Sequence, residues 1–402
     1  MPVRITDNIN WVGSVDWNVR DFHGYETRRG STYNAYTISG QKTALIDTVK
    51  AGFADELIRG VDETIGCGNL DYIINNHSEP DHSGALAKVV RACPQATIVC
   101  SRKAVEILGG YYDTAGWNLQ VVGTGDTLDL GGRSLSFLEV PMVHWPDSMV
   151  SYCPQERILF SNDAFGQHYA SSHRFDDEDD ISVIMAEAKT YYANIVMLYG
   201  KPIAKALAAA SGLDIGMICP SHGSIWRSHV ADILSAYSDW VTCRPRAKVL
   251  VIYCSMWGST DAMAMAIAEG ACRDGVTVKV FDLDASSRTV LATETLDAAV
   301  LAVGSPTLNK TLMPEIAGLL TYLKGLAPRN KAGIAFGSYG WAPNGPNDVN
   351  AYLEQMDFEL LRGPLTCKWR PTAEVLDECR QAGAMLAEKA LQAEATGQSW
   401  QP

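Results

Sequence analysis

The feature that most constrains the fold is an apolar strand that runs directly into a cluster of side chains able to bind metal. Ile73-Ile74 reads as buried strand, and Ser83-Gly84 opens a helical pattern ten residues later. Loops of this kind, at the C-terminal end of a strand, are where sites collect in α/β folds. Four candidate ligands fall within six positions of this loop: His77, Glu79, Asp81 and His82.

Alternate residues of an extended loop project to the same side, so His77, Glu79 and Asp81 can converge while His82 points elsewhere and suits a second metal. A single polar residue after a strand is more often an ordinary hydrogen-bonded loop residue. Recurrence after several strands instead predicts a shared metal site. Three later apolar strands are followed by further candidate ligands, which are His144, Asp163 and His222.

The 402 residues are too many for one ordinary core, so two domains are expected. Pro245 discourages continuation of the helical pattern over 230–240 and precedes an apolar strand at 248–253. The predicted domains are therefore residues 1–245 and 246–402. In the first, short strands with turns precede helices, an α/β layered pattern. Its expected strands are 9–12, 33–38, 43–47, 72–75, 97–100, 119–122, 134–139, 149–153, 157–161 and 215–219, and its expected helices are 53–61, 84–93, 103–109, 179–198 and 230–240.

The second domain alternates strands and helices, which is typical of an open parallel sheet with helices on both faces. The strands are expected at 248–253, 277–282, 297–303 and 332–337. The helices between them are expected at 260–272, 314–324 and 346–356, and a last amphipathic helix at 372–393.

Three loops at the ends of these strands predict a flavin site. Residues 255–260 are rich in hydroxyl groups and lie at a helix N-terminus, where backbone N–H groups can cradle a phosphate. The loop lacks the lysine of a Walker motif and the glycine pattern of a dinucleotide fold, which suits the monophosphate of FMN. The predicted FMN contacts are Ser255, Met256, Trp257, Gly258, Ser259, Thr260, Pro306, Thr307, Leu308, Asn309, Ser338, Tyr339, Gly340 and Trp341.

Composition excludes several classes of function. A net charge of −13 argues against nucleic-acid binding, which leaves a basic footprint. The sequence opens without a charged-then-apolar leader and contains no apolar run of membrane-spanning length, so we expect a cytoplasmic protein that does not enter membranes. The ten cysteines include no C-x-x-C pair, which disfavours iron–sulfur and zinc-ribbon sites.

The ligand motif resembles the metallo-β-lactamase fold, with Asp47 matching that fold's early structural aspartate. Most zinc hydrolases of the fold have histidine where this chain has Glu79. A carboxylate makes the site harder and more negative, which suits iron that must reach the ferric state, whereas zinc has no redox chemistry. With the flavin domain, the whole chain is similar to the flavodiiron proteins. Further matching segments are 16–17, 20–25, 144–148 and 191–194.

The resemblance implies a metallo-β-lactamase-like αββα sandwich followed by a flavodoxin-like doubly wound parallel sheet. One iron would take His77, Glu79 and His144, the other would take Asp81, His82 and His222, and Asp163 would bridge them. His23 and Tyr192 match residues that line the substrate pocket, where they can donate hydrogen bonds or protons.

By the same resemblance, the enzyme reduces O2 to water, NO to N2O, or both, and FMN delivers the electrons. A rubredoxin-type one-electron carrier would supply them as a separate protein. A head-to-tail homodimer, or a dimer of dimers, would bring the FMN of one chain to the iron of its partner. The sequence leaves the choice between O2 and NO open.

Two other readings compete with this one. The first is a di-zinc hydrolase with a fused flavodoxin domain, against which Glu79 argues. The second is a pure electron-transfer flavoprotein with a vestigial lactamase domain, which predicts lost ligands although all seven are present.

His168, His173 and His229 fit no ligand position and are expected at the surface or in ordinary packing. Lys310, directly after Asn309, is expected to place a cation near the flavin ring.

Overall fold

A computed structural model describes residues 1–397 of the chain. Its contacts divide it into two compact units, one formed by residues 1–191 and 201–237, the other by residues 192–200 and the chain from Ser238 onward. The expected boundary after residue 245 falls between helix α7, which ends at Trp240, and strand β17, which begins at Arg246. We keep that boundary as a proposal.

The first unit contains two sheets that face each other. The larger sheet has the strand order β1-β2-β7-β8-β9-β10-β11, in which β8 to β11 run parallel. The smaller has the order β12-β13-β14-β15-β16. The larger sheet comprises β1 (Val3–Arg4), β2 (Ile9–Trp11), β7 (Tyr36–Ile38), β8 (Ala44–Ile46), β9 (Tyr72–Asn75), β10 (Thr97–Ser101) and β11 (Leu119–Val122). The smaller comprises β12 (Thr127–Asp129), β13 (Ser134–Glu139), β14 (Met149–Cys153), β15 (Ile158–Asn162) and β16 (Met217–Pro220).

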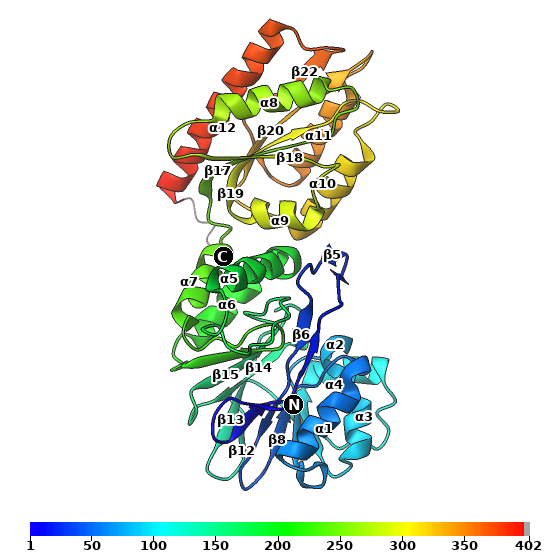
Figure 1. The fold of residues 1–402 in the computed structure, drawn as a ribbon, viewed down its shortest axis with the longest axis vertical. Helices are drawn as coiled ribbons and strands as arrows, with labels where there is room; N and C mark the ends of the chain where they lie inside the picture. Colours follow the sequence, from blue (N-terminus) through cyan, green and yellow to red (C-terminus); the bar gives the residue numbers. More distant parts are fainter. Residues whose placement is uncertain (398–402) are drawn as a thin grey trace. The chain divides into compact units, whose positions relative to one another are not determined.

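Side-chain alternation along the strands builds two cores from the larger sheet. Ile74 of β9 joins the core between the two sheets, where it lies with Phe137 of β13 and Phe160 of β15. Its neighbour Ile73 points the opposite way, into the core that the helices cover. Figure 1 shows these helices beside the sheet. They are α1 (Ala54–Thr64), α3 (Leu86–Ala92) and α4 (Arg102–Tyr111).

The remaining elements of the first unit lie around these sheets. Helix α7 is fixed near the end of β15, because the Tyr237 hydroxyl accepts a hydrogen bond from the backbone N–H of Phe165 at 2.7 Å. Two short ribbons are formed by β3 with β6 and by β4 with β5. The bounds are β3 (Ser14–Asp16), β4 (Asp21–Phe22), β5 (Tyr25–Glu26), β6 (Ser31–Tyr33), η1 (Ala51–Phe53), η2 (Cys67–Asn69), α2 (Pro80–Ser83), α5 (Ile181–Tyr191), α6 (Gly200–Ala210) and α7 (Val230–Trp240).

Two expected elements were wrong in extent. The strand expected at 33–38 is split into β6 and β7, which belong to different sheets. Asn34 lies at the break, and its side chain donates to the backbone carbonyls of Pro220 and Gly223 at 2.9 and 3.0 Å. The helix expected at 179–198 ends as α5 at Tyr191 and continues as the π-helical turn η3 (Tyr192–Val196) and the 3-10 turn η4 (Met197–Tyr199).

The second unit is a sheet with the order β18-β17-β19-β20-β21, and β22 also pairs with β20, all in parallel. Helices α8 and α12 pack together on one face, and α9, α10 and α11 cover the other (Figure 1). The strands are β17 (Arg246–Tyr253), β18 (Thr277–Asp282), β19 (Ala298–Gly304), β20 (Ala332–Tyr339), β21 (Glu359–Leu360) and β22 (Leu365–Lys368). The helices are α8 (Ser259–Ala271), α9 (Arg288–Asp297), α10 (Pro314–Leu326), α11 (Asn344–Gln355) and α12 (Ala373–Thr396).

The doubly wound arrangement therefore agrees with the expectation, although α9, β21 and β22 were not expected. Over residues 1–397, no helix combines the length and the apolar character needed to cross a bilayer.

Candidate metal centre and flavin site

The densest ligand loop is shaped by the start of a short helix. Strand β9 ends at Asn75, and Glu79 occupies the N-cap of α2, with Pro80 at its first position. Proline suits that position because its missing N–H has no partner there in any helix. Gly84 follows, and a Cβ atom at Gly84 would lie 2.7 Å from the backbone nitrogen of Ala51. Glycine therefore lets α2 approach η1 closely.

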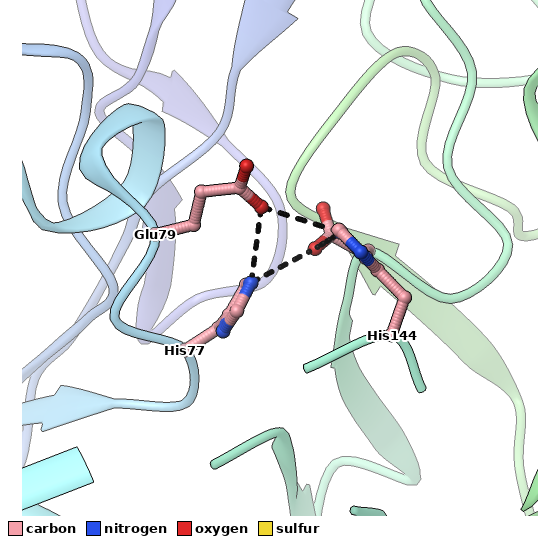
Figure 2. A group of neighbouring side chains, drawn as sticks. His77, Glu79 and His144 are labelled. Atoms are coloured by element: carbon pink, nitrogen blue, oxygen red, sulfur yellow. Dashed lines mark hydrogen bonds and ion pairs between the residues drawn. The ribbon is translucent and has the colours of Figure 1, made fainter. Parts of the chain in front are cut away.

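The first group of candidate ligands consists of His77, Glu79, His144 and Asp163, all buried. Figure 2 labels the first three of them, whose side chains point toward one another. Glu79 Oε2 lies 3.2 Å from His77 Nε2 and 3.3 Å from His144 Nε2. Asp163 Oδ2 lies 3.6 Å from His77 Nε2 and 3.3 Å from His144 Nε2. Three loops that lie far apart in the sequence thus aim four ligand atoms at one point.

The second group consists of Asp81, His82 and His222, also buried. His222 Nε2 lies 3.1 Å from Asp81 Oδ2, and His82 Nε2 lies 3.4 Å from Asp81 Oδ1. The second oxygen of Asp163, Oδ1, lies 3.0 Å from His82 Nε2 and 3.5 Å from His222 Nε2. Asp163 therefore presents one oxygen to each group, which is the arrangement of a bridging carboxylate.

The chemistry of these atoms fits metal ions. Within residues 1–397, both oxygens of Asp81 and Oδ2 of Asp163 are buried and accept no well-aligned hydrogen bond, although histidine nitrogens of the cluster lie 3.1–3.4 Å away. A buried carboxylate oxygen without a partner is costly unless a cation compensates it. Histidine nitrogens and three carboxylates form a donor set that suits iron.

Neighbouring groups fix the orientation of the ligands. Asp147, which is 1% exposed, holds its Oδ1 atom 3.1 Å from His77 Nδ1, and its Oδ2 atom accepts the backbone N–H of Ser78 at 2.7 Å. The Nδ1 atom of His222 lies 2.6 Å from the carbonyl oxygen of Thr32, to which it can only donate. Such partners turn the Nε2 atoms toward the metal.

Asp47 connects two of the ligand loops without reaching the metal site itself. Its carboxylate accepts the backbone and side-chain N–H groups of Asn76 at 2.8 and 3.0 Å, and the side-chain N–H of Asn162 at 3.3 Å. Asn76 precedes His77, and Asn162 precedes Asp163. The buried carboxylate thereby fixes the distance between the two loops, and its burial raises the pKa of Asp47.

Opposite charges dominate the electrostatics of the cluster. Burial disfavours a charged His77, but hydrogen bonds to Asp147 and Glu79 outweigh it and raise the pKa of His77 to about 10. The pKa of His144 is likewise raised to about 10 against burial, by Asp163 and Glu79. The pKa of Glu79 is lowered, because its histidine neighbours outweigh the effect of burial. Without metal, protons on the histidines balance the carboxylates.

The predicted pocket residues lie in different units. His23 forms the turn between β4 and β5 with Gly24, and its Nε2 atom lies 2.7 Å from Glu79 Oε1, the oxygen that faces away from the other ligands of the first group. Tyr192 begins η3 in the second unit, where its ring packs against Trp240. The roles assigned to both residues stay predictions.

The three remaining histidines have different surroundings. His173 is exposed, and His229 lies 2.7 Å from Asp232 at the start of α7. His168 is buried, with its ring centroid 4.7 Å from that of the ligand His222, and its Nδ1 atom lies 2.7 Å from Ser31 Oγ. Burial and the neighbouring His222 lower the pKa of His168.

The flavin loops converge on a cavity of about 260 Å³ at the C-terminal edge of the second sheet. Its walls include nine of the predicted contacts: Met256, Trp257, Ser259, Pro306, Thr307, Ser338, Tyr339, Gly340 and Trp341. Gly258, at φ +80°, walls a neighbouring cavity of about 680 Å³. A cradle with glycine and serine at a helix N-terminus, beside aromatic side chains, fits a phosphate joined to a planar ring.

The other four predicted contacts do not line either cavity, and they lie in the loops that shape the site. Ser255 Oγ accepts the backbone N–H groups of Gly258 and Asp261, and so shapes the phosphate loop. Thr260 is buried and hydrogen-bonds to Ser338. Leu308 pairs with Thr311 in a tight turn, in which Asn309 and Lys310 have positive φ. Lys310 lies outside the walls of both cavities.

One side of the flavin site was not predicted from the sequence. Strand β22 places Trp369 in the walls of both cavities and Arg370 in the wall of the larger one. The strand has only four residues, yet its burial alternates, with Leu365 and Cys367 buried. This short alternation before Trp369 is the signal that could have revealed it.

Comparison with known proteins agrees with the two halves of this description. Residues 32–223 match the family model described as "ODP family beta lactamase", and residues 251–383 match the flavodoxin model. A nitric oxide reductase of Moorella thermoacetica is 44% identical over 391 residues, which cover 96% of this chain and 98% of that protein. The chain belongs to the flavodiiron proteins.

Solved structures of flavodiiron proteins match this one over nearly their whole length. The flavodiiron protein from Giardia intestinalis gives a TM-score of 0.96 at 36% identity, covering 99% of this chain and 98% of that one. Rubredoxin oxygen:oxidoreductase from Desulfovibrio gigas gives a TM-score of 0.94 at 38% identity, covering 98% and 100%. For this flavodiiron protein, the resemblance read from its motifs and the two-part fold are confirmed, and the cofactors are FMN and a di-iron centre.

Proposed function

We propose that this flavodiiron protein reduces O2 to water, NO to N2O, or both, at its di-iron centre with electrons that pass through FMN. The observation that carries the proposal is the bridging position of Asp163, with one carboxylate oxygen facing each ligand group. Two ferrous ions held there would supply two electrons at once to a bound gas. The carboxylate Glu79, in a position where zinc hydrolases of this fold have histidine, favours iron over the di-zinc hydrolase alternative.

The proposed ligand division follows the two groups. One iron takes His77, Glu79 and His144, the other takes Asp81, His82 and His222, and Asp163 is shared. We propose that His23 holds a proton at the edge of the first site, which is supported by its half-exposed Nε2 atom lying 2.7 Å from Glu79 Oε1.

Metal analysis and gas turnover test these proposals together. We expect two iron ions per chain, and anaerobic assays with one reduced donor should show consumption of O2 or NO. Asp163→Asn should lose metal from both sites, whereas His173→Ala, which changes an exposed histidine, should keep both ions. Two zinc ions without iron in the active protein would overturn the oxidoreductase proposal.

We further propose a separate rubredoxin-type electron donor and a head-to-tail dimer, both supported by membership of the family. A cytoplasmic location is consistent with ten cysteines that all remain free thiols. Sedimentation during turnover tests the dimer, since a monomer that retains full activity would contradict it. A reduced rubredoxin that fails to reduce the bound FMN would contradict the proposed donor.

A further inference from the structure

Trp369 stands between the two cavities of the flavin unit. Its side chain walls both the cavity of about 260 Å³ and the neighbouring one of about 680 Å³, together with Trp257 and Ser259. The residue is 67% exposed, so little of its indole is buried by the protein itself. Exposed apolar side chains that gather at a cavity commonly mark a binding site.

The backbone at Trp369 is one that a side chain does not favour. Its φ is +62°, in the left-handed region where glycine is the preferred residue. Lys368 pairs with Tyr339 across β22 and β20, and the Trp369 N–H donates to the Tyr339 carbonyl oxygen at 2.8 Å. The backbone of Trp369 thus takes part in the fold through its hydrogen bond to Tyr339. The exposed indole adds little to the hydrophobic core, and a side chain of this size is unfavourable at a positive φ.

Lys368 fixes the ring from one side. Its ammonium nitrogen lies 4.4 Å from the centroid of the Trp369 ring, in the geometry of a cation–π contact. Because the ammonium group lies over one face of the indole, a planar aromatic ligand would stack on the opposite face. Trp257 and Trp341, which are 91% and 88% exposed, stand in the walls of the same smaller cavity.

From these observations we infer that Trp369 contacts the bound FMN and contributes directly to its affinity. The indole packs against the cofactor as a third tryptophan, beside Trp257 and Trp341. An indole in contact with the isoalloxazine also quenches the flavin fluorescence. The affinity measured by titration therefore reports FMN binding, and the flavin emission of the complex reports contact with the indole. Trp369 is a cofactor-positioning residue, and it extends the flavin site to the segment directly after β22, outside the three loops that the sequence marks as the flavin site.

The test is Trp369→Gly in the full chain, with FMN removed and titrated back. Loss of the stacking contact should weaken FMN binding about tenfold and raise the residual flavin emission of the complex. Glycine relaxes the positive φ, so the thermal midpoint of the FMN-free variant should equal or exceed that of the wild type. Trp369→Phe should restore most of the affinity, and Trp17→Ala, which changes an exposed tryptophan of the first unit, should leave it unchanged.

Two results would overturn the inference. In the first, Trp369→Gly binds FMN with wild-type affinity and unchanged emission, which means that the indole does not touch the cofactor. In the second, Trp369→Gly loses affinity together with a lowered thermal midpoint that Trp369→Phe does not restore, which assigns the residue to folding.

Discussion

Replacement of Asp147 with asparagine removes one charge from the support of the metal centre and leaves every ligand in place. The wild-type carboxylate satisfies two buried donors, with Oδ1 at 3.1 Å from His77 Nδ1 and Oδ2 accepting the Ser78 N–H at 2.7 Å. Asparagine has a single acceptor oxygen, and its NH2 group would face whichever donor that oxygen does not serve. Either Ser78 or His77 then loses its acceptor.

The expected size follows from that unpaired donor. A buried donor without a partner costs about 1–3 kcal/mol. Loss of the carboxylate partner of a ligating histidine typically lowers metal affinity about 10–100-fold, which corresponds to about 1.4–2.8 kcal/mol. The two estimates agree, so Asp147→Asn should release the metal of the His77 group at a chelator concentration about 10–100 times lower than in the wild type.

The assay is metal content after equilibration with increasing chelator. Asp176→Asn is the matched control, because Asp176 is also a buried carboxylate that accepts backbone N–H groups, including that of His229 at 2.7 Å, but touches no ligand. We expect the control to keep the chelator sensitivity of the wild type. An unchanged response of Asp147→Asn, or an equal response of both variants, would refute the reasoning.

Three further outcomes are expected. Glu79→His should retain two metal ions but exchange iron for zinc at the first site, because replacing the carboxylate with imidazole removes a negative charge. Metal analysis of protein from cells grown with both metals tests this, and two iron ions per chain would contradict it. At pH 7.5 the raised pKa values of His77 and His144, each about 10, keep both protonated without metal. Metal loading should therefore release protons, and affinity should fall as the pH falls; an indicator dye that detects no release disproves this. Asp47→Ala should lower the free energy of unfolding by about 3 kcal/mol, because the amide donors of Asn76 and Asn162 lose their acceptor; a loss under about 1 kcal/mol in urea unfolding would argue against that linking role.

Local pattern was sufficient for most elements and for the candidate ligands. The apolar run at 72–75 and the ligand loop after it were expected where the structure has β9 and α2. Long-range contacts decided where such expectations were wrong. Asn34 breaks an otherwise continuous strand pattern, because its amide serves carbonyl groups of the His222 loop nearly 190 residues away in the sequence. Strand β22 has only four residues, so its alternation is a weak local signal, and its pairing with β20 is what establishes it as a strand.

The sequence by itself predicted the candidate metal ligands and most of the residues around the flavin cavities, because most of them follow an apolar strand that can be recognised locally. The sequence also indicated the preference for iron, because that preference depends on Glu79 being a carboxylate, and the residue type can be read without knowing the structure. Only the tertiary structure showed that Asp81 lies with His82 and His222, so the prediction from loop alternation that Asp81 converges with His77 and Glu79 was wrong. The tertiary structure also decided the support of His77 by Asp147 and the place of Trp369 beside the flavin cavities. Those features depend on distances between loops that sheet pairing and sandwich packing set, and no local pattern encodes such distances.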